Sequence, residues 1–327
     1  MNIVTGSPSS RRKGRFIHRP HNALYMGVKG YIFCFLMILP AIYGIVRYIY
    51  INSYSILLSF FTDVPFKSDF TLEHFHAFFT ELFSFSSSMN IGLRNTFMYF
   101  GIGILKSFVC FIIAYFLYKK IPLFRVHRFL LFIPCIIPSV ASVAIFKEII
   151  SKGGPIYTWL NTTFGVDYVQ PWVASSNPRA ALTSILLYML LGSGIGNVYL
   201  IYIGNMKRIP NEMLESARLD GANSWREFWS FILPLTWGTF STFLLISVAG
   251  IFTSSGPILY FFGDSETIFY LETQTLGYIL FDKVRGDGVV AYYNSASAIG
   301  LVFTLFTIPI VILTRYISKK LNPEVTY

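Results

Sequence analysis

The sequence predicts an all-α integral membrane protein with six membrane-spanning helices. Only 13% of its 327 residues are charged and 54% are hydrophobic, whereas a soluble protein of this length has about a quarter charged residues. Six apolar runs are long enough to cross the roughly 30 Å hydrocarbon core of a bilayer, which needs about 20 helical residues. They cover residues 30–51, 95–118, 129–150, 181–204, 231–253 and 296–316.

The positions of lysine and arginine predict the orientation of these helices. Seventeen of these residues fall in four segments that would share one side of the membrane: 11–29, 119–128, 207–226 and 315–320. Five fall in the opposite loops: Lys67, Lys152, Arg179, Lys283 and Arg285. Because cytoplasmic loops carry the excess of positive charge, both termini are predicted to be cytoplasmic.

We expect three parts along the chain: a basic cytoplasmic tail over residues 1–27, a membrane domain over 28–320 and a short tail over 321–327. The first apolar run is too long and too deep in the chain to be a cleaved signal. The basic tail either sets the orientation or binds anionic lipid headgroups. The three cysteines each lie in an apolar run, which predicts buried thiols rather than a disulfide framework. They are Cys34, Cys110 and Cys135.

The connector over residues 209–234 is a polar, sharply punctuated segment between two apolar runs. Pro210 predicts the start of a short helix, because proline tolerates the first helical position. Gly221, after Asp220, predicts its end, since glycine adopts the left-handed conformation that caps a helix. A second helix is predicted from Ser224, with Glu227 at the spacing of a capping box. Pro234 is predicted to kink or tilt the helix that follows.

Two short helices that present acids and small residues are typical of a segment that lodges in a groove on a partner. An ordinary amphipathic connector would explain the helices, but it would not explain the combination of acids, small residues, Asp-Gly break and downstream Leu-Pro. The segment therefore predicts docking to a soluble partner. The residues concerned are Glu215, Ser216, Ala217, Asp220, Gly221 and Ala222.

The pattern Glu215-Ser-Ala-x-x-Asp220-Gly221-Ala222, followed by Ile232-x-Pro234, resembles the EAA loop of binding-protein-dependent ABC importer permeases. Ser216 stands where alanine is usual. Supporting matches to the sugar-transport branch, similar to the maltose and glycerol-phosphate permeases, extend the resemblance over about residues 28–320. They are Leu39-Pro40-Ala41, Asn95-Thr96, Ile133-Pro134, Ile137-Pro138, Gly256-Pro257 and the segment 293–298.

The resemblance implies a type I ABC importer permease fold in a bacterial or archaeal cytoplasmic membrane. In that family the EAA helix docks in a cleft on the ATP-hydrolysing subunit. The resemblance therefore assigns ATPase coupling to Glu215, Ser216, Ala217, Asp220, Gly221 and Ala222. It also implies a second permease subunit in a heterodimer, two copies of the ATPase, and an extracytoplasmic solute-binding protein that delivers a sugar.

The sequence contains no Gly-Lys pair and hence no Gly-Lys-Ser/Thr phosphate loop. ATP and Mg are therefore expected on the partner ATPase. No catalytic residue and no cofactor are expected on this chain. No metal site is expected either, because Glu73-His74-x-His76 has no further ligands near it.

By the resemblance, contacts to an oligosaccharide or sugar derivative come from the fourth and fifth spans. The spacing within each span places the candidates on one helix face. A small-residue contact between helices explains the glycines beside Ser193 equally well, and the two interpretations are compatible. The candidates are Ser193, Asn197, Ser247, Gly250, Ile251 and Ser254.

Lys106 is the ionisable residue closest to mid-membrane, where a charge is costly. It is predicted to face the translocation path or to pair with an acid on the partner permease. An acidic sugar is one reason for such a charge. The alternative is snorkelling towards the interface or a structural pairing.

Other function classes fit less well. A permease of the same ABC type that carries a non-sugar solute is an alternative. A secondary transporter would also have six spans but would need no EAA loop. An intramembrane protease would need a base near Ser193, yet the five histidines lie outside the predicted spans. The formal net charge of +10 is concentrated in the orienting segments, so nucleic acid is not an expected partner.

Overall fold

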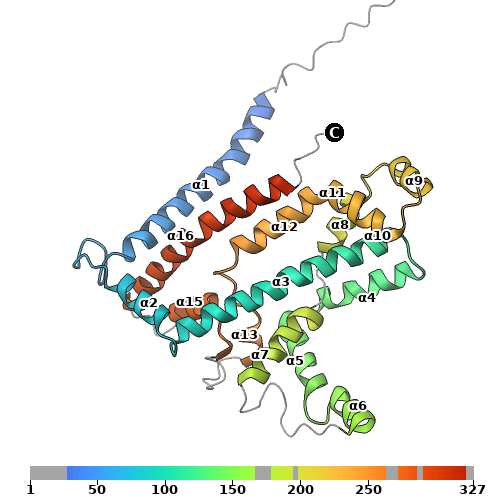
Figure 1. Cartoon of the computed structure of the whole chain (residues 1–327). Helices are drawn as coiled ribbons and strands as arrows, with labels where there is room; N and C mark the ends of the chain where they lie inside the picture. The colour runs from blue at the N-terminus through green and yellow to red at the C-terminus, as the bar shows by residue number, and fades with distance from the viewer. Residues whose placement is uncertain (1–27, 166–177, 194–197, 263–271, 286–289, 322–327) are drawn as a thin grey trace, which may run out of the picture. The chain divides into compact units, whose positions relative to one another are not determined.

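A computed structural model describes residues 28–165, 178–193, 198–262, 272–285 and 290–321. These residues form helices and connectors, with an isolated β-bridge between Phe61 and Phe70 (Figure 1). The all-α prediction is confirmed for this part of the chain. The chain divides into two compact units, Met1–Tyr54 and Ser55–Tyr327, and each is described by itself.

The described part of the first unit is the helix α1 (Val28–Leu58) up to Tyr54. The helix is long and apolar enough to cross a membrane. Side chains such as Phe35 and Ile42 are more than half exposed along it. Apolar surface of this extent is stable against lipid or another protein rather than against water, which agrees with its prediction as a span.

Two long helices of the second unit also meet the length and hydropathy of a span. They are α3 (Ser88–Tyr118) and α16 (Val290–Leu321), and they match the second and sixth predicted runs. The Ser87 side chain caps α3 by accepting a hydrogen bond from the Asn90 N–H at 3.2 Å.

The third predicted run is broken into α4 (Phe124–Ile136) and α5 (Ser139–Ile150). The axes on the two sides of the break differ by 107°. The break falls at Pro138, which lacks an N–H donor and drives Ile137 into an extended conformation with ψ 128°. A straight third helix, as the run alone implies, is wrong.

The fifth predicted run is also bent. A short π-helix η2 (Phe228–Ile232) and α11 (Leu233–Leu235) lead into α12 (Trp237–Ala249) with a bend of 71° across the break. The non-helical residue is Thr236, with ψ 8°. The kink predicted at Pro234 is therefore present, two residues further on.

The fourth predicted run begins as α7 (Pro178–Leu187) and continues as the π-helix η1 (Tyr188–Gly192). It resumes as α8 (Val198–Met206) after residues outside the described ranges. Within the described residues, three helices are long enough to span a membrane, or up to five if each bent pair is one span. A multi-span architecture is thus confirmed, and the count of six and the orientation stay predictions.

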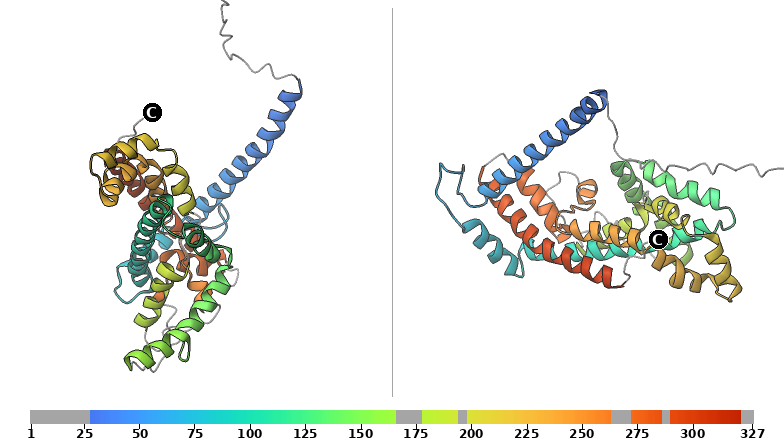
Figure 2. Two further views of the ribbon diagram at one scale, coloured as in Figure 1. Left: turned by 90° about the vertical axis from the view of Figure 1, so that its right-hand side faces the viewer. Right: turned by 90° about the horizontal axis from the view of Figure 1, so that it is seen from above.

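The second unit is organised around α3, which packs against α8, α12 and α15 (Leu276–Arg285) (Figure 2). Buried aromatic side chains fill the space between these helices. The Phe111 and Tyr202 rings, for example, meet edge to face with centroids 5.0 Å apart. Cys110 is buried here as predicted, whereas Cys34 and Cys135 are half-buried. Three shorter helices of the second unit are α2 (Glu73–Phe83), α6 (Pro155–Phe164) and α13 (Ile258–Phe262) (Figure 1).

Candidate coupling site and substrate path

The coupling segment begins with α9 (Asn211–Leu219), one residue later than predicted because Pro210 precedes the first helical residue. Gly221 follows the helix end with φ +80°. Its N–H donates to the Arg218 carbonyl at 3.0 Å, and the Ala222 N–H donates to the Ala217 carbonyl at 3.0 Å. This pair of bonds is a Schellman motif, so the predicted helix end at Asp220-Gly221 is confirmed.

The second helix, α10 (Ser224–Glu227), begins at the predicted residue. Its cap differs from the prediction. The Asn223 side-chain oxygen accepts the Arg226 N–H at 2.8 Å, so Asn223 and not Ser224 is the N-cap. The capping-box role predicted for Glu227 is wrong, because this carboxylate turns inwards and is only 1% exposed.

Glu227 joins three helix ends. Its carboxylate accepts from Lys119 Nζ, at the end of α3, at 3.0 Å and from Arg218 Nε, in the last turn of α9, at 3.1 Å. Burial raises the pKa of Glu227, but the bonds from Arg218 and Lys119 outweigh that effect and hold its pKa below the usual value. We call Lys119, Arg218 and Glu227 the charge brace.

A second contact supports the same junction. The Tyr115 hydroxyl of α3 donates to the Ser224 carbonyl at 2.8 Å, and Lys119 Nζ also donates to Ser224 Oγ at 3.0 Å. The position of α9 and α10 is therefore tied to the end of α3. Sequence reasoning missed this brace, because its members are distant in the chain and only the inward turn of Glu227 reveals it.

The predicted coupling residues divide by exposure. Ala217 is buried and Ala222 is half-buried, so these two let α9 pack closely against the chain itself. The other four are exposed and present acids and small groups to a partner. Leu219, which the sequence analysis did not single out, is 89% exposed. The sequence could have indicated this exposure, because Leu219 does not share the apolar face that Leu214 and Ala217 form on α9. The four exposed coupling residues are Glu215, Ser216, Asp220 and Gly221.

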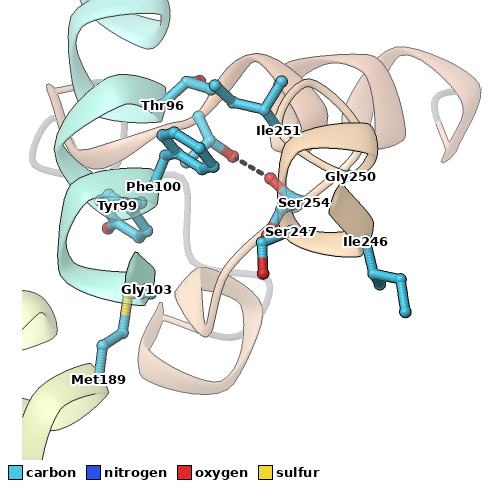
Figure 3. A pocket seen from close by; sticks show the side chains of 11 residues that line it. Thr96, Tyr99, Phe100, Gly103, Met189, Ile246, Ser247, Gly250, Ile251 and Ser254 are labelled. Carbon is cyan, nitrogen blue, oxygen red and sulfur yellow. Dashed lines mark hydrogen bonds between the residues drawn. The ribbon is translucent and has the colours of Figure 1, made fainter. Parts of the chain in front are cut away.

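A cavity of about 270 Å³ lies between α3, η1 and α12. Figure 3 shows the Tyr99 and Phe100 rings of α3 on one side and Ser247 and Ile251 on the other. Four of the predicted path residues thus come together around one cavity, but the predicted single helix face is wrong, because α12 ends at Ala249 and only Ser247 of the four lies in it. These four are Ser247, Gly250, Ile251 and Ser254.

Lys106 and Ser193 meet next to this cavity. Lys106 Nζ donates to Ser193 Oγ, and Ser193 Oγ donates to the Met189 carbonyl at 2.8 Å. Neither residue lines the cavity itself, but Met189 and Gly103, one helical turn before Lys106, both do. Asn197 lies outside the described residues.

Glycine at position 192 allows the close packing of η1. A Cβ atom there would lie 2.6 Å from the Tyr188 ring and 3.1 Å from the Phe146 ring. The helix-packing interpretation of this small-residue patch is therefore correct for Gly192, and the neighbouring Ser193 contacts Lys106.

Sequence reasoning missed the other polar side chains of the cavity wall, which are Thr96, Tyr99 and Thr275. Thr96 Oγ1 accepts the Leu276 N–H at 2.9 Å, and the Tyr99 hydroxyl donates to the Thr273 carbonyl at 3.2 Å.

Asn95 adds two bonds to the same segment, to the Glu272 carbonyl at 2.7 Å and the Gln274 carbonyl at 3.0 Å. We call Asn95, Thr96 and Tyr99 the α3 clasp, because they hold the main chain of residues 272–276. The Asn95-Thr96 pair was noted only as a match to a family, with no structural role attached.

Residues 106–326 match the model of a family described as the binding-protein-dependent transport system inner membrane component. This chain belongs to that family. The matched range contains the coupling segment, so the resemblance carried by the EAA pattern is confirmed. Membership assigns the chain to the membrane component of such a system.

Curated relatives of this inner membrane component include two sugar permeases. The multiple sugar-binding transport system permease protein MsmF of Streptococcus mutans is 24% identical over 189 residues, or 58% of this chain and 61% of that protein. The maltose/maltodextrin transport system permease protein MalF of Escherichia coli is 32% identical over 113 residues, or 34% of this chain and 21% of that protein. The chain thus spans less than two thirds of these relatives.

A solved structure agrees on the fold. A chain from the crystal structure of a bacterial alginate ABC transporter, in complex with an alginate pentasaccharide-bound periplasmic protein, superposes with a TM-score of 0.72. The match covers 90% of this chain and 97% of that chain at 17% sequence identity. The ABC importer permease fold is therefore shared.

Proposed function

We propose that this chain is the membrane-spanning subunit of an ATP-driven importer for an oligosaccharide or sugar derivative. The observation that carries the proposal is the pair of short helices α9 and α10 with the exposed turn between them, in a member of the binding-protein-dependent family. We call this segment, residues 211–227, the elbow. The names of the relatives, which transport maltodextrin and multiple sugars, support the sugar class.

The proposed topology has six spans and cytoplasmic termini in a bacterial or archaeal inner membrane. The positive charge of the segments around residues 119–128 and 207–226 supports this orientation. The elbow then faces the cytoplasm, where a soluble ATPase can reach it.

The proposed complex contains a second permease subunit, two ATPase copies that hold ATP and Mg, and an extracytoplasmic solute-binding protein. The apolar surface of α1 offers area to a second permease or to lipid. The solved alginate transporter, which was crystallised with a periplasmic protein, supports the binding-protein partner.

The proposed mechanism is alternating access driven through the elbow. Glu215 and Asp220 bind donors on the ATPase, while Gly221 permits the sharp turn between α9 and α10. The charge brace transfers movement of the elbow to α3, which forms one wall of the cavity. No covalent chemistry takes place on this chain.

Glu215→Lys in the complete complex tests the coupling role. This exposed residue has no structural partner to lose among the described contacts, so the variant should insert normally and lose ATP-driven uptake. Glu212→Lys, a charge reversal three residues before the motif triplet on the same helix, is the matched control and should keep uptake. Full uptake by Glu215→Lys would contradict the proposal.

The cargo class needs a separate experiment. Mass spectrometry of the co-purified complex should find a solute-binding protein, an ATPase and a bound sugar. A bound non-sugar solute would favour the alternative importer. Uptake by the purified chain without nucleotide would favour a secondary transporter.

A further inference from the structure

We propose that Lys106 and Ser193 form an anion-recognition point at the edge of the cavity and that the cargo sugar carries a carboxylate. The inference rests on the proposed function and narrows its substrate class to acidic sugars, such as an oligosaccharide of hexuronic acid.

The first observation is the direction of the Lys106 side chain. Lys106 lies in the middle third of α3, more than three turns from either end of the helix, where a charge is costly if α3 spans a membrane. Its Nζ is bound to Ser193 of the neighbouring segment, so the side chain turns into the helix bundle. Snorkelling does not describe this geometry.

The second observation is the lack of a countercharge. In the described part of the chain, both ion pairs within 4 Å are made by Glu227, at the far end of α3, and neither involves Lys106. The cavity wall contains no charged side chain either. The ammonium therefore has a hydrogen-bond partner from this chain but no described anion to balance its charge.

The third observation is the connection to the cavity. Gly103 and Met189 line it, and they lie one helical turn from Lys106 and from Ser193 respectively. Gly103 has no side chain, and a Cβ atom there would meet nothing within 4 Å. The space beside Gly103, on the cavity wall one turn from Lys106, is thus open.

These observations fit a carboxylate better than a hydroxyl or a phosphate. An ammonium carries three donors, and Ser193 accepts from one of them, which leaves donors for a ligand. A charge-assisted bond away from water is stronger than a neutral one. A single lysine balances one negative charge, as on a uronate ring, rather than the two of a phosphate.

The test uses the complete complex in proteoliposomes with two cargoes: a hexuronic acid trisaccharide and the same trisaccharide with its carboxyl groups reduced to hydroxymethyl. Initial uptake is measured below saturation for wild type, Lys106→Met and Lys106→Arg. The ratio of variant to wild type for one cargo cancels the selectivity of the solute-binding protein.

We expect Lys106→Met to slow uptake of the uronate about tenfold or more, the loss of a charge-assisted hydrogen bond. It should change uptake of the reduced trisaccharide less than twofold on the same scale. Lys106→Arg should keep the preference for the uronate. Lys147→Met is the matched control: its Nζ donates to the Phe261 carbonyl at 2.8 Å, and it should affect both cargoes alike.

Equal losses for the two cargoes in Lys106→Met would overturn the inference and leave the proposed function standing. If Lys106→Met fails to assemble, the ratio of Lys106→Gln to wild type for each of the two cargoes decides in the same way. Failure of wild type to carry either trisaccharide overturns the inference, and failure to carry any sugar with ATP counts against the proposed function as well.

Discussion

Glu227 holds a buried negative charge where α3, α9 and α10 meet. Its spacing from Ser224 predicted a cap, and the helix start was predicted correctly. Asn223 is the N-cap instead, because its short side chain accepts the Arg226 N–H directly. Lys119, which attracts Glu227 inwards, is 108 residues away in the chain. Local pattern alone could not bring these two together.

Glu227→Gln should weaken the junction without changing its shape. The amide keeps one acceptor but leaves Lys119 and Arg218 without their countercharge. We expect the free energy of unfolding to fall by about 1–2 kcal/mol, at the low end for a buried hydrogen-bonded charge, because Arg218 is half exposed to solvent. Thermal unfolding of the purified complex measures the change.

Uptake per ATP hydrolysed should also fall in Glu227→Gln, since the elbow is less firmly tied to α3. Glu212→Gln, an exposed acid in the first turn of α9, is the control and should change neither quantity. Normal stability and normal coupling in Glu227→Gln would show that the brace has no mechanical role.

Gly221 is required for its backbone conformation and not for lack of space. Its φ is +80°, and an added Cβ would meet nothing within 4 Å. We expect Gly221→Asn to be tolerated best. Gly221→Ala should raise the free energy of the left-handed turn by about 1 kcal/mol, and Gly221→Val should raise it further, in the order of left-handed propensity. Uptake rates of the three variants check the order. Equal rates would mean that the turn is not needed.

Among the elements, the elbow was predicted most completely. Pro210, Asp220-Gly221 and Ser224 marked both helices to within a residue, because caps and breakers act locally. The bends in the third and fifth predicted runs were predicted less well. Pro138 signals a break, but the 107° change of direction depends on how α5 packs against α13 and η1, which no local signal encodes.

Leu219→Ser should weaken the hold of the elbow on its ATPase. This side chain is 89% exposed at the end of α9, and exposed apolar groups in a docking element are typical anchors. We expect less ATPase to co-purify with the variant. Leu123→Ser, which replaces a 71% exposed leucine in the connector between α3 and α4, is the control. Unchanged ATPase recovery in Leu219→Ser would exclude Leu219 as an anchor.

For the molecule as a whole, composition was enough to predict a helical membrane protein, and the EAA pattern was enough to predict the family. The wall of the cavity was predicted in part. Ser247, Gly250 and Ser254 do line one cavity, but only Ser247 lies in a helix, because α12 ends at Ala249. The opposite wall, with Thr96 and Tyr99, was missed because its place depends on contacts across α3, α12 and α15.

The complete chain should depend on a partner for its stability. The α1 helix is apolar along its length and long enough to cross a membrane, and in the proposed heterodimer a second permease would cover part of its surface. We expect the chain expressed alone to be recovered in lower yield, and in larger detergent aggregates, than the chain co-expressed with its partner permease. Size-exclusion chromatography of both preparations checks this. Equal behaviour would argue against an obligate second permease.

The α3 helix is held near both ends. The clasp fixes Asn95 and its neighbours to residues 272–276, and the brace fixes Lys119 to the elbow. About 36 Å of helix without proline lies between the two points. An unbroken helix resists compression along its axis, so a displacement at one of these two points would move the other. In the proposed importer, the arrival of cargo and the nucleotide state of the ATPase would then be communicated through one rigid helix.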